Sequence, residues 1–332
     1  MGARGAKQKQ KLLYLAKIML EKTDDNHGLT VNEIIDLLEQ YDITAERKSI
    51  YSDLEELTDF GIEILTEKVG RSYTYHVGSR QFELAELKML VDTVQASKYI
   101  TEKKSRQLIK KLEGLVSVYE AKMLQREVQM QDRIKTMNET VLYSVDTIQQ
   151  AMAENKQITF KYYQWNEKKE MVLRHDGAIY RVSPWNLVLD QENYYLIGFD
   201  QNAKAIKHYR VDKMIRLKIA DKKREGRERY ETRNMATYTT VRFGMFDGVE
   251  EMVSMEFENR FAGVVIDRFG KDVRMLPIDE NHFRVKLKIV VSSQFFGWVL
   301  GLGDGVKITG PEYVVQQMKE QVKKIWMKYE GN

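Results

Sequence analysis

Apolar and polar residues follow different periods along the chain, and each period predicts a different kind of element. Between residues 7 and 60 the apolar residues recur every three or four positions, which is typical of amphipathic helices. Two further runs, residues 62–65 and 73–77, alternate with polar residues on either side of Gly70, as the strands of a hairpin do. Residues 1–80 are therefore predicted to form three helices followed by a two-stranded wing.

The helical spacing returns over residues 83–96 and 106–130. The second stretch predicts one long, continuous helix. We expect residues 81–140 to form a helical linker between two domains. The long apolar stripe suits pairing across a dimer or packing within its own chain, and the pattern leaves both readings open.

Short apolar runs separated by polar turns follow a further predicted helix at residues 144–152. Such runs predict the strands of a small β-barrel over residues 141–222. They lie at residues 158–163, 171–173, 179–182, 187–189, 194–199 and 206–209. Residues 222–229 are charged and have no apolar period, so residues 223–249 are predicted to be a mobile connector.

The last stretch, residues 250–332, mixes both spacings in the order strand, helix, strand, strand, helix, strand, with a final helix behind them. That order predicts a ferredoxin-like domain. The chain as a whole is expected to be an α+β multidomain protein.

Side chains that accept hydrogen bonds from free backbone N–H groups predict where the helices begin. The predicted N-caps are Thr30, Thr44, Ser144, Asn259 and Ser293. Glu33 stands three residues after Thr30, which is the spacing of a capping box.

Composition narrows the function classes. The chain has 332 residues and no cysteine, which excludes disulfides, thiolate metal sites and a cysteine nucleophile. The sequence lacks an apolar run long enough to cross a membrane, and its first residues lack the apolar core of a signal peptide. We expect a cytoplasmic protein without membrane partners.

Charge is unevenly distributed along the chain. The net charge is +4, yet residues 204–233 hold twelve Lys and Arg against five Asp and Glu. Residues 1–80 hold eleven Lys and Arg against fourteen Asp and Glu. A front domain that binds nucleic acid must therefore use a local basic face.

The third predicted helix carries such a face. Its N-terminal half has cations and hydroxyls, and its C-terminal half is acidic, which suits a recognition helix whose first residues enter the major groove of double-stranded DNA. The charges alone are also typical of an ordinary solvated helix. The candidate DNA-binding residues are Arg47, Lys48, Ser49, Tyr51 and Ser52, with Arg71 of the wing on the DNA backbone.

Three separated motifs resemble the bacterial transcriptional regulators that carry a WYL domain. The motifs are residues 180–184 (YRVSP), 193–196 (NYYL) and 208–213 (HYRVDK). Tyr194 stands where the family's name-giving Trp would be, and Ser183 stands where many members have His. The segment at residues 45–57 also looks like the recognition helix of these regulators. The resemblance implies a winged helix-turn-helix at the front, an SH3-like WYL barrel that senses a ligand, and a C-terminal extension.

Cations and aromatic rings interleave in the third motif, and aromatic residues beside cations are typical of sites that hold single-stranded nucleic acid. We expect a phosphate-bearing ligand, such as a short oligonucleotide or another nucleotide-like molecule. The candidate ligand-binding residues are Ser183, Tyr195, His208, Tyr209, Arg210 and Lys213. A guanidinium grips phosphate in a fork geometry, which favours Arg210. The alternative is that Arg210 pairs with Asp212 and only pins the barrel.

Other functions have weaker support. The five histidines are scattered, so we expect no metal and no cofactor. A hydrolase or transferase would have to use His208, Arg210 and Asp212 with Tyr195, and no nucleophile with an orienting base is evident. We therefore expect no enzyme activity. A ligand-independent architectural DNA-binding protein is a third possibility.

A homodimer is expected, because regulators of this shape usually read two half-sites.

Overall fold

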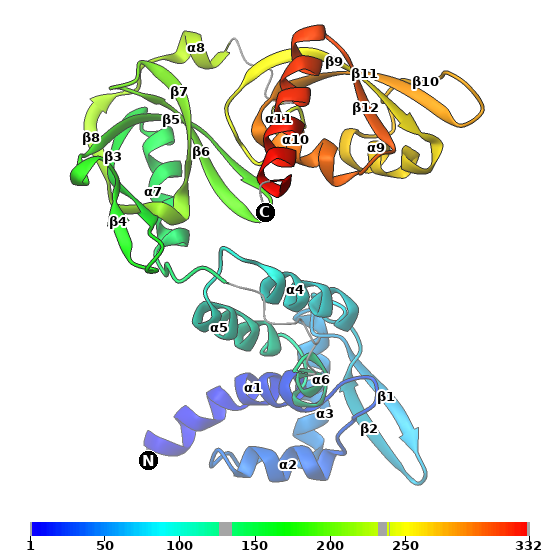
Figure 1. Cartoon of the computed structure of the whole chain (residues 1–332). Helices are drawn as coiled ribbons and strands as arrows, with labels where there is room; N and C mark the ends of the chain where they lie inside the picture. The colour runs from blue at the N-terminus through cyan, green and yellow to red at the C-terminus, as the bar shows by residue number, and fades with distance from the viewer. Residues whose placement is uncertain (1, 126–134, 232–237, 239, 331–332) are drawn as a thin grey trace. The chain divides into compact units, whose positions relative to one another are not determined.

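The computed structural model describes residues 2–125, 135–231, 238 and 240–330. The chain separates into two compact units, Met1–Glu139 and Thr140–Asn332 (Figure 1). Both contain helices and strands, so the chain has the mixed α+β character that its periods predict.

The first unit begins with three helices and a hairpin. These are α1 (Gly2–Lys22), α2 (Val31–Glu39), α3 (Arg47–Asp59), β1 (Ile64–Val69) and β2 (Ser72–Val77). The apolar faces of the helices meet in one core, in which Leu15, Ile34 and Ile50 are fully buried. The hairpin turns at Gly70, whose φ of +64° is one that glycine adopts without steric cost.

Of the predicted helix caps, the one at Thr30 is correct and the others differ from the structure. Thr30 caps α2, with its side chain accepting from the N–H of Glu33 and the Glu33 carboxylate accepting from the N–H of Thr30, as predicted. Glu46 precedes α3 without a side-chain cap, so Thr44 does not cap that helix.

Three further predicted caps differ from the structure. Ser144 lies inside α7 (Val141–Ala153). Asn259 begins a short 3₁₀ turn, η3 (Asn259–Phe261), and its side chain donates to the carbonyl of Glu280. Ser292 caps α10 (Ser293–Gly301), one residue before the predicted position.

The predicted long helix over residues 106–130 is wrong. The first unit continues with α4 (Leu84–Ala96), α5 (Glu102–Glu113) and α6 (Val118–Leu124), and residues 126–130 lie outside the described residues. The helix stops at Gly114 and restarts because the Ser117 hydroxyl accepts from the N–H of Glu120 in a new capping box. Leu87, Val116 and Leu124 share one core, so the apolar spacing continues across the break.

The second unit begins with α7 against a curled sheet (Figure 1). The elements are β3 (Lys156–Trp165), β4 (Met171–Leu173), η1 (Arg174–Gly177), β5 (Tyr180–Asp190), β6 (Asn193–Asp200), β7 (Ala205–Arg210), η2 (Val211–Lys213) and β8 (Met214–Lys223). The strand order is β4-β3-β5-β6-β7, and β8 pairs with β3 off this path.

Two strands differ from the prediction. The runs at residues 179–182 and 187–189 are one strand, β5, whose register with β6 shifts between Pro184 and Asn186. Strand β8 follows the third motif and was not predicted as a strand. It supplies the neighbour on which β3 completes its hydrogen bonding.

The start of the predicted mobile connector is ordered. Helix α8 (Arg227–Glu231) follows β8. The Arg224 guanidinium donates to the carbonyl of Pro184 over 2.9 Å and lies 4.4 Å from the ring centroid of Trp185. A basic side chain with these partners packs on the sheet, and the charge pattern alone does not reveal that.

The C-terminal part of the second unit has the predicted element order. It contains β9 (Val249–Glu258), η3, α9 (Ala262–Phe269), β10 (Met275–Pro277), β11 (His282–Val291), α10, β12 (Val306–Gly310) and α11 (Glu312–Glu330). The antiparallel sheet has the order β10-β11-β9-β12. Phe257 and Phe295 are fully buried in its core. None of the described helices combines the length and hydrophobicity that crossing a bilayer requires.

Candidate functional site

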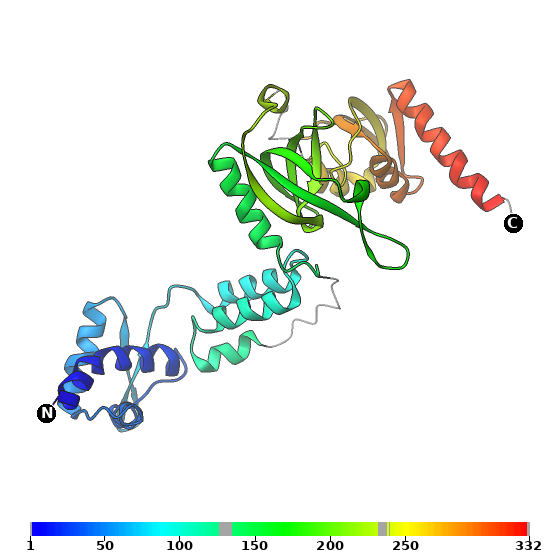
Figure 2. The same cartoon turned by 90° about the vertical axis from the view of Figure 1, so that its left-hand side faces the viewer.

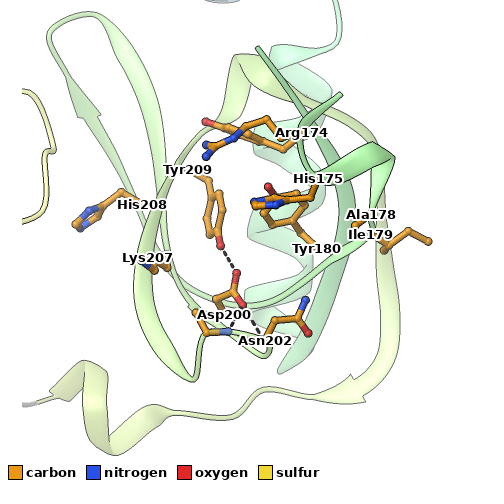
Figure 3. Close-up of a pocket in the computed structure, with 12 residues that line it drawn as sticks. Arg174, His175, Ala178, Ile179, Tyr180, Asp200, Asn202, Lys207, His208 and Tyr209 are labelled. Atoms are coloured by element: carbon orange, nitrogen blue, oxygen red, sulfur yellow. Dashed lines mark hydrogen bonds between the residues drawn. The ribbon is translucent and has the colours of Figure 1, made fainter. Parts of the chain in front are cut away.

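A hollow of about 500 Å³ lies in the curled sheet of the second unit (Figure 3). We call it the sheet hollow. Residues of β3, η1, β5 and β7 line it, together with the segment before β5, the end of β6 and the turn after β6. They are Tyr162, Arg174, His175, Ala178, Ile179, Tyr180, Asp200, Asn202, Ala203, Lys207, His208 and Tyr209.

The floor of the sheet hollow is fixed by hydrogen bonds. The buried Tyr209 hydroxyl donates to Oδ2 of Asp200. Oδ1 of Asp200 accepts from the backbone N–H groups of Asn202 over 2.7 Å and Ala203 over 2.8 Å. Burial raises the pKa of Tyr209, and Asp200 raises it further, so the phenol keeps its proton at neutral pH.

Aromatic rings form the rest of the floor. Tyr180 stacks on Phe160 with 5.4 Å between ring centroids and 5° between planes, and Tyr162 packs against both rings. Burial raises the pKa of Tyr162 to about 12. Its hydroxyl oxygen accepts from the N–H of Arg210 over 3.0 Å, which ties β3 to β7.

The rim of the sheet hollow is a strained turn. His175 and Asp176 have φ values of 50° and 53°, and Gly177 follows with 78°. Left-handed backbone in residues other than glycine is uncommon, and such strain clusters at functional sites. The turn brings Arg174 and His175 to the hollow (Figure 3), with the Arg174 guanidinium 6.0 Å from the centroid of the Tyr162 ring. Within the described residues Arg174 forms no ion pair.

A cluster of cations lies beside the hollow. Arg210 pairs with Asp212 over 2.9 Å and also donates to Oδ1 of Asn193 over 2.8 Å. Burial by itself would lower the pKa of Arg210, but the bonds to Asp212 raise it. Burial lowers the pKa of Lys213, and the charges of Arg210 and Arg174 lower it further. The charges of Arg174, Arg210 and Asp212 all act on Lys213, so three cations lie near a single carboxylate. The excess of positive charge attracts anions.

The six predicted ligand residues do not form one pocket. Of the six, Tyr209 has its side chain directed into the sheet hollow, and His208 lines it but turns its ring away to bond with Tyr238 over 2.7 Å (Figure 3). Ser183 is fully buried, and its hydroxyl accepts from the N–H of Glu225. Tyr195, Arg210 and Lys213 lie outside the hollow's lining.

Sequence reasoning missed most of the lining. Arg174 and His175 lie in a turn without apolar period, and Tyr162 reads as an ordinary strand residue. Tyr180 opens the first motif but was not singled out as a ligand residue. One signal was present at Asp200. A carboxylate that ends an apolar strand and precedes Asn202 is typical of a side chain that caps its own turn.

In the first unit, a second hollow of about 260 Å³ lies between α3, the hairpin and the start of α2. We call it the hairpin hollow. It is lined by Thr30, Val31, Asn32, Arg47, Tyr51, Arg71, Ser72, Tyr73 and Tyr75. Three of the predicted DNA-binding residues, Arg47, Tyr51 and Arg71, therefore meet at one place.

The other predicted DNA-binding residues divide into two groups. Lys48 and Ser52 are exposed on α3. Ser49 faces α1, where Lys11 donates to its hydroxyl and pairs with Asp53. Ser49 is thus engaged inside the first unit. Within the described residues there is no group of three His, Cys, Asp or Glu side chains that could hold a metal ion.

Two family models match the second unit: the WYL domain at residues 144–219 and the WCX domain at residues 250–326. No curated protein matches the chain. The solved structures that match include proteasome accessory factor B/C (PafBC) of Arthrobacter aurescens, with 17% identity and a TM-score of 0.27 over 95% of this chain and 46% of that chain. A CRISPR Cas-related protein matches with 13% identity and a TM-score of 0.37 over 98% and 85%. The chain thus spans about half the length of the PafBC chain.

Proposed function

Because the chain is a WYL-domain protein with a WCX domain behind the WYL domain, we propose that it is a DNA-binding transcriptional regulator of the cytoplasm. Residues 1–80 act as a winged helix-turn-helix and residues 81–140 as a helical linker. Residues 141–222 act as an SH3-like sensing barrel, residues 223–249 as a connector, and residues 250–332 as a ferredoxin-like extension.

One observation carries the DNA-binding part of this proposal. Arg47 begins α3 and Arg71 lies in the hairpin turn, and both line the hairpin hollow beside Tyr51. Cations and hydroxyls that converge between a recognition helix and a wing suit the phosphates that flank a major groove. Lys48 and Ser52 are exposed on α3 and remain available for base edges or further phosphates.

Charge reversal tests DNA binding. The full chain carrying Arg47→Glu and Lys48→Glu is compared with wild type on a duplex selected from a random pool. We expect binding to weaken at least about tenfold, since losing one contact costs about 1–3 kcal/mol. A matched control reverses Lys110 and Lys111, an exposed pair on α5, with the same change in net charge. Equal binding by both double variants would refute DNA recognition through α3.

The second part of the proposal is that the WYL domain senses a phosphate-bearing ligand, either a short single-stranded oligonucleotide or another nucleotide-like molecule. The cations Arg174, Arg210 and Lys213 outnumber the one carboxylate among them, and the aromatic floor of the sheet hollow lies next to them. Cations beside ring faces are how single strands are held. Ligand binding is proposed to change the affinity of the first unit for its operator.

We further propose a homodimer. The C-terminal half of α11 extends beyond the sheet of its domain (Figure 2) and exposes Val322, Ile325, Trp326 and Tyr329 at helical spacing. An apolar stripe of this kind on a helix suits a second copy of the same surface, because a two-fold interface pairs a patch with itself.

A further inference from the structure

We propose that the sheet hollow takes a terminal nucleoside monophosphate, meaning the phosphorylated end of a strand or a free mononucleotide, and excludes nucleotides within a strand. This inference rests on the proposed sensing of a phosphate-bearing ligand by the WYL domain. It adds the part of the ligand that is recognised and the residues that recognise it.

The depth of the hollow is the first argument. Tyr162, Asp200 and Tyr209 are 8%, 6% and 7% exposed, so the hollow ends on buried side chains. Its volume of about 500 Å³ lies within the range of about 300–1,000 Å³ that small-molecule sites occupy. A nucleotide inside a strand has backbone on both sides and needs an open groove. A hollow with a closed floor accepts an end.

The ring faces are the second argument. Phe160 supports Tyr180 in a nearly parallel stack, and Tyr180 lines the hollow. His175 lies 5.9 Å from Tyr180 at an interplanar angle of 56°, at the rim of the same space. A base that enters the hollow can stack on Tyr180, and such a stack contributes about 1–3 kcal/mol.

The charges are the third argument. Arg174, His175 and Lys207 line the hollow, and the only carboxylate in its lining, Asp200, already accepts from Tyr209, Asn202 and Ala203. A terminal phosphate carries a charge of about −1.5 to −2 at pH 7, and a phosphodiester within a strand carries about −1. Arg174 forms no ion pair within the described residues. Its guanidinium should therefore attract the phosphate at a strand end more strongly than a phosphodiester in the middle of a strand.

Calorimetric titration of the full chain tests this inference. The protein carries Arg47→Glu and Lys48→Glu, so that the first unit does not compete for nucleic acid. The probes are adenosine 5′-monophosphate and 20-nucleotide deoxyadenylate strands in four forms: 5′-phosphorylated, 3′-phosphorylated, hydroxyl-ended and closed into a circle. We expect one of the phosphorylated ends to bind at least about tenfold more tightly than the hydroxyl ends, and the circle to bind most weakly.

The free mononucleotide separates the two sources of the ligand. If adenosine 5′-monophosphate binds as tightly as the phosphorylated strand, the hollow is assigned to a free nucleotide. If it binds much more weakly, the hollow is assigned to a strand end. A circle that binds as tightly as the phosphorylated strand overturns the inference, and so does the absence of binding by every probe. Wild-type protein is titrated in parallel with its selected duplex. Duplex binding without the expected preference among the probes would overturn the inference about the hollow and leave the proposed DNA binding intact.

Two variants locate the effect. Arg174→Ala should abolish the preference for a phosphorylated end, and Tyr180→Leu should weaken all adenine probes while leaving that preference. Arg181→Ala is the matched control, because Arg181 is exposed on β5, next to Tyr180, and lies outside the lining of the hollow. Circular dichroism checks that each variant is folded. A folded Arg174→Ala variant that keeps the full preference places the phosphate elsewhere and overturns the assignment.

Discussion

Arg210 and Asp212 meet in a two-point contact, with Nε of Arg210 3.0 Å from Oδ1 of Asp212 and Nη2 2.9 Å from Oδ2. Nη2 also donates to Oδ1 of Asn193 at the start of β6. The sequence left two readings of Arg210 open, a ligand contact and a pin. Because Arg210 already makes these bonds, we propose that it pins the barrel. We propose Arg174, which forms no ion pair among the described residues, as the better candidate for the ligand.

Replacing Arg210 tests that reading. Arg210→Ala should lower the free energy of unfolding by about 1–3 kcal/mol, because Asp212 and Asn193 lose a charged donor in a half-buried place. For a unit of this size, that corresponds to a fall of about 2–4 °C per kcal/mol in melting temperature, measured by calorimetry. Arg181→Ala, on an exposed site, is the control. An unchanged melting temperature together with a lost ligand response would instead make Arg210 a ligand residue.

A second prediction concerns Asp24 in the first unit, where the turn after α1 meets α6. Asp24 is 4% exposed, and it accepts from the Ser117 hydroxyl and from Nδ1 of His27. Burial by itself would raise the pKa of Asp24, but the bonds from Ser117 and His27 lower it below its usual value. A carboxyl of this kind stabilises the fold above its unfolded pKa of about 4, and the stabilisation is lost as pH falls through the lower folded value.

We therefore expect Asp24→Asn to lower the free energy of unfolding at pH 7 by about 1–3 kcal/mol. The difference from wild type should shrink as the pH falls below about 4, where the wild-type carboxylate itself becomes protonated. Calorimetry at several pH values measures both effects. Asp25→Asn, an exposed neighbour, should change little. Equal melting temperatures of wild type and Asp24→Asn at pH 7 would contradict this role.

The sequence predicted those features that depend on neighbours in the chain. The Thr30 capping box, strand β4 and the strand-helix order of the last domain each follow from a local spacing. The break between α5 and α6 was missed because both helices face one core, so the apolar period hides the restart at Ser117.

The candidate site was less predictable, because its residues meet through tertiary contacts. Tyr209 and Asp200 are nine positions apart and bond across the curl of the sheet, while Arg174 reaches the hollow through a left-handed turn. Ser183 was predicted to donate to the ligand, yet its side chain is buried and its hydroxyl accepts from the N–H of Glu225. No pattern of spacing specifies these contacts.

The third prediction concerns the homodimer. The double substitution Ile325→Glu and Trp326→Glu would place two charges in the proposed apolar interface, where unpaired charge is costly. The double variant should be a monomer at micromolar concentration, at which we expect wild type to be a dimer by light scattering. Lys324→Glu changes the charge of the same helix without removing an apolar side chain and should remain dimeric. A dimer that survives the double substitution would move the interface away from α11.

The last prediction is that Arg47 and Arg71 hold the same DNA phosphate. Both line the hairpin hollow of about 260 Å³, where Tyr51 and Tyr75 lie with ring centroids 6.3 Å apart and Tyr73 completes the wall. Two arginines that line one hollow can donate to the same phosphate. Two cations on one phosphate are coupled, so their effects on binding should not add.

A double-mutant cycle measures the coupling. Arg47→Ala and Arg71→Ala should each weaken duplex binding by about tenfold, since each removes about 1–3 kcal/mol, and together they should weaken it by less than the product. Loss of one shared phosphate should reduce the slope of log affinity against log salt by about 0.9, whereas loss of two separate phosphates should reduce it by about 1.8. Lys68→Ala, an exposed hairpin cation outside the hollow, should combine additively with Arg47→Ala. Additive effects of Arg47→Ala and Arg71→Ala, with the larger change in slope, would assign the two arginines to different phosphates and leave the hairpin hollow without a common ligand.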